Sequence, residues 1–347
     1  MPNKTVNLKQ LSKHLGLSQT TVSRALNGFP EVSEKTRLRV RQAADKFNYR
    51  PSPSASSLAT GKARIIGHVV PVSEHRMLNP HFSDFLAGAS DTYAQAGYDL
   101  LLRAAPPESE FEIYRDFAQR NRVDGVVVHG PMVNEPRIEQ LKQIGLPFVV
   151  HGRAGGEEHS YSWLDVDNKS AIEKLTHYLI DLGHRRIALI NGLETMNFAH
   201  RRRIGYETAL KDHGIPVDAQ LISSADMNEP YGYDATMEKL SMDNPPTAFL
   251  YSSVLSAMGG MRAANVHGQL PGKDISLATF DDKLSFLQAN DGPRMTPYMT
   301  SVSSSIQDAG RRVGEMLIDQ IANPTAPPVC ELWKTDLVIG QTTGRVG

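Results

Sequence analysis

The sequence predicts a small all-α head followed by a large α/β body of two doubly wound units. Apolar residues recur at helical spacing in residues 1–50, whereas short apolar runs alternate with helical patterns from residue 64 onward. The net charge of the chain changes sign at the same place. Residues 1–64 contain 12 Lys and Arg against 3 Asp and Glu, a balance of +9, and the rest of the chain balances at −10. A compact basic head indicates a polyanionic partner, and nucleic acid is the leading candidate.

The head is expected to contain a helix, a tight turn, a second helix and then a third. Apolar residues stand at helical spacing on both sides of Gly16, namely Leu8, Leu11, Leu15, Leu17, Val22, Ala25 and Leu26. Asn7 and Ser18 are placed to cap the first two helices. A third amphipathic segment opens at Ser33 and ends near Tyr49. Three short helices of this kind can share one small core.

The outward face of the second helix is polar and almost free of acidic groups. It carries Gln19, Thr20, Thr21, Ser23, Arg24 and Asn27. Such a face suits a DNA major groove, because the first turn and the arginine can reach base edges while hydroxyls and the helix N-terminus meet phosphates. Periodicity and caps alone leave a purely structural three-helix bundle as the alternative.

Residues 51–63 have the composition of a linker, with small residues and no bulky anchor. Ser52 followed by Pro53 can nevertheless cap and begin a short helix, with Leu58 as its lone apolar projection. A leucine exposed there could wedge between base steps in the minor groove and kink the duplex. An ordinary flexible tether is the alternative.

The body shows the rhythm of parallel α/β structure. Its expected strands lie in IIGHVV, YDLLL, VDGVVV, PFVV, RIALING, TAFLYS and ISLATF, with helical patterns between them. Because open α/β sheets bind ligands at the carboxyl ends of their strands, the loops after these runs should line a cleft between the two units.

Several classes of protein do not fit. The sequence contains no nucleophile elbow, phosphate-cradling Gly-rich loop or metal-spaced His pair, so we expect neither an enzyme nor a cofactor or metal. A periplasmic solute-binding protein would carry a signal peptide and no basic head. No apolar stretch approaches the ~20 residues of a membrane span, so we expect a cytoplasmic protein without membrane contact. The single cysteine, Cys330, excludes an intramolecular disulfide.

The segments TVSRALNG, VSEKTRLRVRQAADKFNYRP and SSLATGK closely resemble the head of the lactose-repressor (LacI/GalR) family. The resemblance implies a DNA-binding transcriptional regulator, most often a repressor, that binds a pseudo-palindromic operator as a homodimer. By position, it implies base contacts from Gln19, Thr20 and Arg24, and minor-groove contacts from Ala55 and Leu58. Phosphate contacts are implied for Thr21, Ser23, Asn27 and Thr36. The hinge differs from the family's commoner pattern at Pro53 and in its serines.

LIDLGHRRIALING and ISLATFDD extend the resemblance to the body, where it implies the fold of type I periplasmic binding proteins. We expect a helix-turn-helix domain over 1–50, a hinge over 51–63 and an effector-binding and dimerisation domain over 64–347. The last divides into an N-subdomain, about 64–164 and 295–325, and a C-subdomain, about 165–294 and 326–347. The chain should cross between them near Asp165, near 290–300 and near 324–329.

The resemblance also implies a small-molecule effector, and a sugar suits the polar and aromatic residues of the loops. Asp281 and Arg202 match the ligand aspartate and arginine of the family. Further candidates for the effector site are Phe82, Trp163, Asp167, Phe198, Met227 and Ser253. A helix cap is the alternative for Asp281, and ordinary core packing is the alternative for the aromatic residues.

HGR, YSWLDVDN and FAHRRRIGY resemble segments of family members that sense α-glucosides such as maltose, sucrose or trehalose. A purine-like or other non-sugar effector, or a corepressor in place of an inducer, remains an alternative. The sequence does not distinguish these ligands, nor does it contain a terminal heptad that would indicate tetramers.

Overall fold

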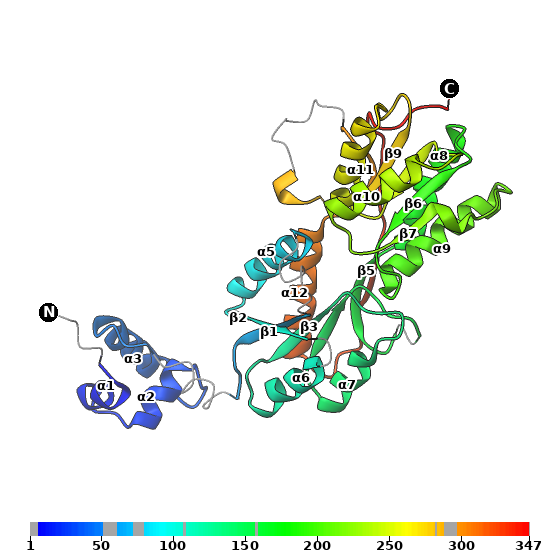
Figure 1. Cartoon of the computed structure of the whole chain (residues 1–347). Coiled ribbons are helices and arrows are strands. Elements are labelled where there is room, and N and C mark those ends of the chain that lie inside the picture. Colours follow the sequence, from blue (N-terminus) through cyan, green and yellow to red (C-terminus); the bar gives the residue numbers. More distant parts are fainter. Residues whose placement is uncertain are drawn as a thin grey trace.

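The computed structural model describes residues 6–50, 61–71, 80–106, 109–156, 159–281, 283–287 and 297–346. Within these ranges a helical head precedes two α/β lobes, as Figure 1 shows. Most of the predicted hinge, including Ala55 and Leu58, lies outside the described residues.

The helices of the head are α1 (Leu8–Leu15), α2 (Gln19–Leu26) and α3 (Glu34–Lys46). Asn7 and Gln10 form a reciprocal capping box at α1, and the side chains of Ser18 and Ser33 accept backbone N–H groups at the starts of α2 and α3. Gly16 ends α1 in the left-handed conformation that the tight turn requires. The predicted helices and caps are therefore confirmed.

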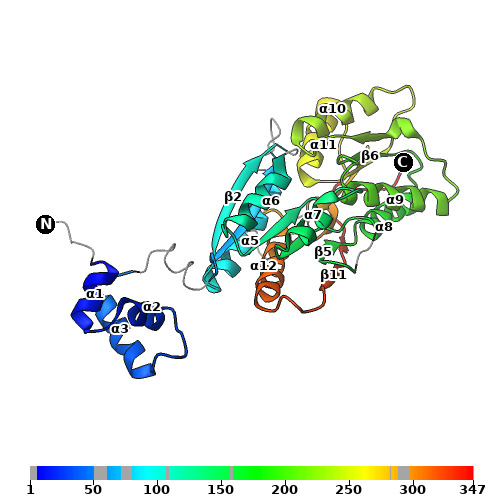
Figure 2. The same cartoon turned by 90° about the horizontal axis from the view of Figure 1, so that it is seen from below.

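The first lobe is built on a six-stranded parallel sheet in the order β11-β5-β4-β3-β1-β2. Its elements are β1 (Ile65–Pro71), α5 (Pro80–Gln95), β2 (Asp99–Ala105), α6 (Glu110–Gln119), β3 (Gly125–His129), α7 (Pro136–Ile144), β4 (Phe148–His151), β5 (Ser162–Val166), α12 (Ile306–Ala322) and β11 (Cys330–Trp333). Helices α5 and α12 cover one face of the sheet, and α6 and α7 cover the other (Figure 2).

The second lobe has the strand order β12-β10-β9-β8-β6-β7, in which only β12 runs antiparallel to its neighbour. Its helices are α8 (Asn168–Asp181), α9 (Asn197–Asp212), α10 (Glu229–Leu240) and α11 (Val254–Val266), with short turns η2 (Ala219–Leu221) and η3 (Ser285–Leu287). Its strands are β6 (Ile187–Asn191), β7 (Ile222–Ser224), β8 (Ala248–Tyr251), β9 (Ser276–Asp281), β10 (Thr300–Ser303) and β12 (Asp336–Val338). The two doubly wound units are thus as predicted.

Two of the three predicted crossings between lobes are wrong. Strand β10 pairs with β9 in the second sheet, so the second crossing follows β10 rather than preceding it. Strand β11 pairs with β5 in the first sheet, so the third crossing lies between β11 and β12. Both strands are short, and their partners rather than their own composition determine which sheet they join. The first crossing lies between Val166 and Asn168, beside the expected Asp165.

Neighbouring helices in each lobe approach closely at paired glycines. A Cβ added to Gly88 of α5 would lie 1.9 Å from the carbonyl oxygen of Gln307, and one added to Gly310 of α12 would lie 2.1 Å from that of Phe85. Helices α10 and α11 repeat the arrangement through Gly232 and Gly259. Because backbone touches backbone at these points, no larger side chain fits without separating the helices.

Candidate DNA-binding face and effector cleft

Helix α2 presents opposite faces to the core of the head and to solvent. Val22 and Ala25 are buried against the other two helices. On the outer side, the three predicted base-contacting residues are exposed: Gln19, Thr20 and Arg24. The amphipathic pattern therefore leaves the polar face predicted from the sequence accessible.

The predicted phosphate-contacting residues are partly buried and help to fix the helix ends. The hydroxyl of Thr21 lies 2.8 Å from the hydroxyl of Ser18. The hydroxyl of Thr36 lies 2.9 Å from the hydroxyl of Ser33. The amide of Asn27 donates to the carbonyl of Ser23 at 2.9 Å. Thr21 and Thr36 thus contact the capping serines and Asn27 ends α2, while DNA contact remains a prediction for all of these residues.

Arg202 forms the centre of the second lobe's contribution to the cleft. It is buried, with 5% exposure. Its Nε donates to Asn168 Oδ1 at 2.8 Å, and its Nη1 donates to the carbonyl of Ser252. Its guanidinium carbon lies 3.8 Å from the ring centroid of Phe280 and 5.0 Å from that of Phe198. The arginine is therefore held rigidly at the carboxyl ends of β6, β8 and β9.

Three further effector candidates gather around this arginine. Phe198 and Met227 flank Gly192, so close that an added Cβ would lie 3.1 Å from the Phe198 ring and 3.2 Å from the Met227 sulfur. Asp281 follows Phe280 directly, and its Oδ1 accepts the backbone N–H of Lys283 at 2.8 Å. One carboxylate oxygen of Asp281 therefore caps a turn. This resembles the helix cap that the sequence left open as the alternative role of Asp281.

Ser253 and Asp167 are also caps. Ser253 is buried and accepts the backbone N–H of Leu255 at the start of α11. Asp167 accepts the N–H of Ser170 at the start of α8. Both caps lie at the cleft edge of the second lobe, next to residues that bind Arg202.

The first lobe meets the cleft with a histidine and phenylalanine cluster on β1, β3, β4 and α5. His68 Nδ1 lies 2.9 Å from His129 Nε2, and one ring donates to the other. The His129 ring packs edge-on against Phe82 and Phe85 at 5.1 and 4.9 Å, and the His151 ring lies 4.4 Å from that of Phe85. Phe82, predicted for the effector site, therefore belongs to an aromatic wall.

Burial keeps His68 and His129 neutral. The pKa of His68, which is fully buried and also hydrogen-bonded to Tyr93 Oη, is lowered from 6.5 to about 3 by the loss of hydration. Burial lowers the pKa of His129 well below its ordinary value, and His68, His151 and Arg137 lower it further. A neutral imidazole can both donate and accept hydrogen bonds, and the contact between His68 and His129 uses one nitrogen in each role.

A buried ion pair lies at the first crossing. Arg153 Nε donates to Asp165 Oδ2 at 3.0 Å, and Asn168 donates to the other carboxylate oxygen at 3.1 Å. Burial raises the pKa of Asp165 to about 6, although Arg153 acts in the opposite direction. Since Asn168 also binds Arg202, polar contacts run continuously from one lobe to the other.

Trp163 does not gather with the other candidates. It is 4% exposed and packs within the first lobe's core with Phe117, Val128 and Val150. Of the two interpretations that the sequence allowed, the structure supports the buried structural tryptophan over the sugar-stacking one. The Arg153 guanidinium covers the ring at 5.4 Å.

The lobes contact each other at both margins of the cleft. Asn197 and Val133 form backbone hydrogen bonds across it, to Pro131 and Thr195. On the other side, both carboxylate oxygens of Asp84 on α5 accept from Ser285, its N–H and its hydroxyl, at 2.6 Å each. Hydrogen bonds therefore join the two lobes at two separate places.

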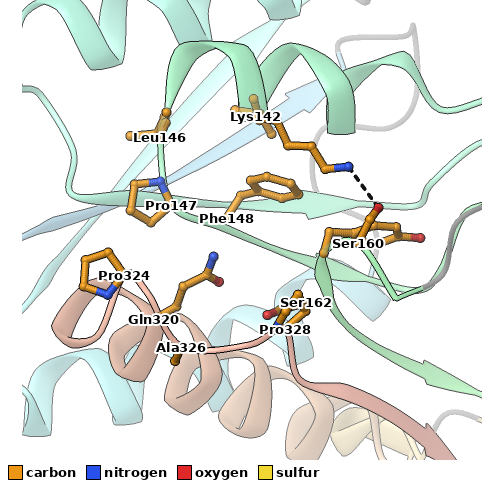
Figure 3. Close-up of a pocket in the computed structure, with 13 residues that line it drawn as sticks. Lys142, Leu146, Pro147, Phe148, Ser160, Ser162, Gln320, Pro324, Ala326 and Pro328 are labelled. Carbon is orange, nitrogen blue, oxygen red and sulfur yellow. Dashed lines mark hydrogen bonds between the residues drawn. The ribbon is translucent and has the colours of Figure 1, made fainter.

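A separate pocket of about 320 Å³ lies at the opposite edge of the first sheet, where β4, β5 and β11 begin. Figure 3 shows Lys142 beside it, donating to the Ser160 hydroxyl at 2.9 Å. Since it opens at the amino ends of the strands, this pocket is distinct from the cleft.

Sequence analysis missed His68, His129, Asp165 and Asn168 as cleft residues. One signal was present: each of the two histidines interrupts or ends an apolar run that reads as a buried strand, IIGHVV and GVVVH. A polar residue in such a run is buried, and buried polar groups need partners. The partners themselves come from distant parts of the chain and could not be inferred.

Two family models match the chain. "Bacterial regulatory proteins, lacI family" matches residues 7–52, and "Periplasmic binding proteins and sugar binding domain of LacI family" matches residues 63–331. The HTH-type transcriptional regulator AglR of Rhizobium meliloti (strain 1021) is 42% identical, covering 98% of this chain and 94% of that protein. The regulator RafR of Escherichia coli is 32% identical, covering 96% of each.

Solved structures of LacI-family regulators also resemble this chain. A transcriptional regulator CelR–cellobiose complex is 26% identical, with a TM-score of 0.71 over 97% of this chain and 99% of that one. The lac repressor dimer bound to operator and the anti-inducer ONPF, 23% identical, has a TM-score of 0.79 over 98% and 100% and supports the fold alone. Among the described helices, none combines the length and the apolar character needed to cross a membrane.

Proposed function

This chain belongs to the LacI family of transcriptional regulators. We propose that it is a repressor and that an α-glucoside lowers its affinity for operator DNA. In this proposal a homodimer binds a pseudo-palindromic operator in the cytoplasm through α2 and the hinge. The sugar binds between the lobes. The chain has no catalytic role in this scheme.

The observation that carries the sugar assignment is the environment of Arg202. A buried guanidinium is fixed by Asn168 and Ser252 and lies over two phenyl rings. The first lobe adds a separate cluster of histidine and phenylalanine rings. Arginine offers several donors in a fixed plane, and aromatic rings pack against the apolar faces of sugars. The similar CelR structure is a complex with cellobiose, which supports a sugar as the ligand.

Release would follow from differential affinity for two arrangements of the lobes. A ligand that prefers one arrangement shifts the population toward it, and the shift changes the spacing of the two hinges in the dimer. The hinges then no longer fit the operator's half-sites, and the affinity for DNA falls.

The test begins with an operator selected from a random duplex library by the full-length protein. Fluorescence anisotropy at one stated salt concentration then measures binding with maltose, sucrose, trehalose, cellobiose or a purine base added. We expect one α-glucoside alone to weaken binding. Release by the purine would replace the sugar by the alternative effector, and tighter binding with any ligand would indicate a corepressor.

Two pairs of variants separate DNA reading from sensing. Arg24→Ala should weaken operator binding by ~1–3 kcal/mol, whereas Arg41→Ala, which removes another exposed arginine of the head, should have a smaller effect. Arg202→Met should abolish release by sugar while DNA binding persists. Its control is Arg203→Met, since Arg203 forms ion pairs with Glu194 and Glu207. Equal effects of the two methionine variants would place the effector elsewhere.

A further inference from the structure

The middle of α8 and the C-terminal end of α9 bring two carboxylates and a histidine together. Glu173 and His177 lie four residues apart on α8 and therefore share one face. Asp212 is the last residue of α9. The nearest donor atoms of the three side chains all lie within 4.8 Å of one another.

We propose that these three side chains form a binding site for a divalent transition-metal ion of the Zn²⁺ class. His177 Nε2 lies 3.8 Å from Asp212 Oδ2 and 4.0 Å from Glu173 Oε1. Both distances are too long for a hydrogen bond. In a tetrahedral zinc site with bonds of ~2.0–2.2 Å, ligand atoms are about 3.3–3.5 Å apart. A small rotation of partly exposed side chains closes that difference.

Neighbouring groups orient the three ligands. His177 Nδ1 lies 3.0 Å from His213 Nε2, so the other nitrogen of His177 faces the carboxylates. Metal-binding histidines are held by a hydrogen bond at the remote nitrogen in the same way. Lys169 donates to Glu173 Oε2 at 3.0 Å, which leaves Oε1 on the side of His177. His213 is thus a positioning residue in this proposal.

The electrostatic setting also favours a cation. Asp212 stands at the C-terminal end of α9, where the helix dipole is negative and a carboxylate is unfavourable without a positive partner. With an imidazole and two carboxylates, the donor set matches ions that accept both nitrogen and oxygen ligands. Solvent would supply the remaining ligand, since the Asp212 side chain is 55% exposed.

A bound ion would join the middle of α8 to the C-terminal end of α9. The same two helices begin at the cleft, with Asp167 capping α8 and with Phe198 and Arg202 in the first turns of α9. Gly205 lets the two helices touch, because a Cβ there would lie 2.2 Å from the carbonyl oxygen of Lys169. The site does not depend on which effector binds, nor on DNA.

Zn²⁺ binding to tag-free, full-length protein tests the proposal. In isothermal titration calorimetry with Zn²⁺ alone, the wild type should bind one equivalent of the ion. When Co²⁺ replaces Zn²⁺, the protein should show the visible d–d absorption typical of a metal ion with a low coordination number. His177→Ala should remove this equivalent. His213→Ala should weaken it by about 10-fold, the usual effect of losing a partner of a metal ligand.

The matched control is His267→Ala, because His267 is an exposed histidine at the C-terminal cap of α11 in the same lobe. It should bind Zn²⁺ as the wild type does, and Zn²⁺ should raise the melting temperature of both but not that of His177→Ala. Equal melting temperatures without metal would show that all variants fold. Zn²⁺ binding by His177→Ala at wild-type affinity, or no stoichiometric binding by the wild type, would overturn the proposal.

Discussion

Replacing His68 by asparagine should make the first lobe less sensitive to acid. His68 is fully buried in β1, between Tyr93 Oη and His129, and its pKa is lowered from 6.5 to about 3. In the unfolded chain the same imidazole is hydrated and takes up a proton near its ordinary pKa. Between pH 6.5 and pH 3 the unfolded state therefore binds more protons than the folded one.

The sign and size follow from proton linkage. When the unfolded state binds more protons, the free energy of unfolding falls as the pH falls. The His68 contribution is fully present above about pH 7 and is lost progressively toward pH 3. From pH 7 to pH 5 the expected loss is about 2 kcal/mol for this one side chain. Asparagine does not titrate, so the variant escapes this loss even if it is less stable at both pH values.

Tryptophan fluorescence during urea unfolding measures the effect. Both tryptophans of the chain, Trp163 and Trp333, lie in the first sheet, so their emission reports on the lobe that contains His68. Between pH 7 and pH 5 the wild type should lose about 2 kcal/mol more than His68→Asn. His267→Asn, at an exposed position, should behave as the wild type. An equal loss in wild type and His68→Asn would refute the inference that burial keeps His68 neutral.

Three other substitutions probe packing and closure. Trp163→Phe should lower the free energy of unfolding by of order 1–2 kcal/mol in urea titrations while leaving sugar affinity unchanged; weaker sugar binding would restore its effector role. Gly205→Ala should cost ~1–3 kcal/mol by the same measurement, since the new methyl would meet the Lys169 carbonyl; unchanged stability would contradict the close helix contact. Asp84→Asn should speed amide hydrogen exchange at Ser285, measured by mass spectrometry, because the carboxylate binds that N–H across the lobes; unaltered exchange would argue against the contact.

The sequence was most informative where structure depends on nearby residues. The caps at Asn7 and Ser18 depend on groups three residues away, and both were predicted and are present. The third helix was expected to open at Ser33, which the structure shows to be its cap. Seven strands of the body, β1 to β4, β6, β8 and β9, were predicted because buried parallel strands are continuous apolar runs. The polar face of α2 follows from helical periodicity in the same way.

The sequence did not predict features of the structure that depend on contacts between residues far apart in the chain. Strands β10 and β11 join the sheets that their neighbours determine, so the second and third crossings were misplaced. Trp163 is compatible with a sugar face or a core, and only the packing of β5 between β4 and β11 places it inside. The cluster of His68 and His129 requires two strands to be adjacent, which no local pattern reveals.

The paired glycines that join α5 to α12 and α10 to α11 have a mechanical consequence. With backbone against backbone, there is no layer of side chains that could shear between those helices, so each lobe is stiff. Any opening of the cleft must then be absorbed by torsion in the three short connections between lobes. Substitutions in those connections, rather than in either lobe, should alter how readily the molecule opens.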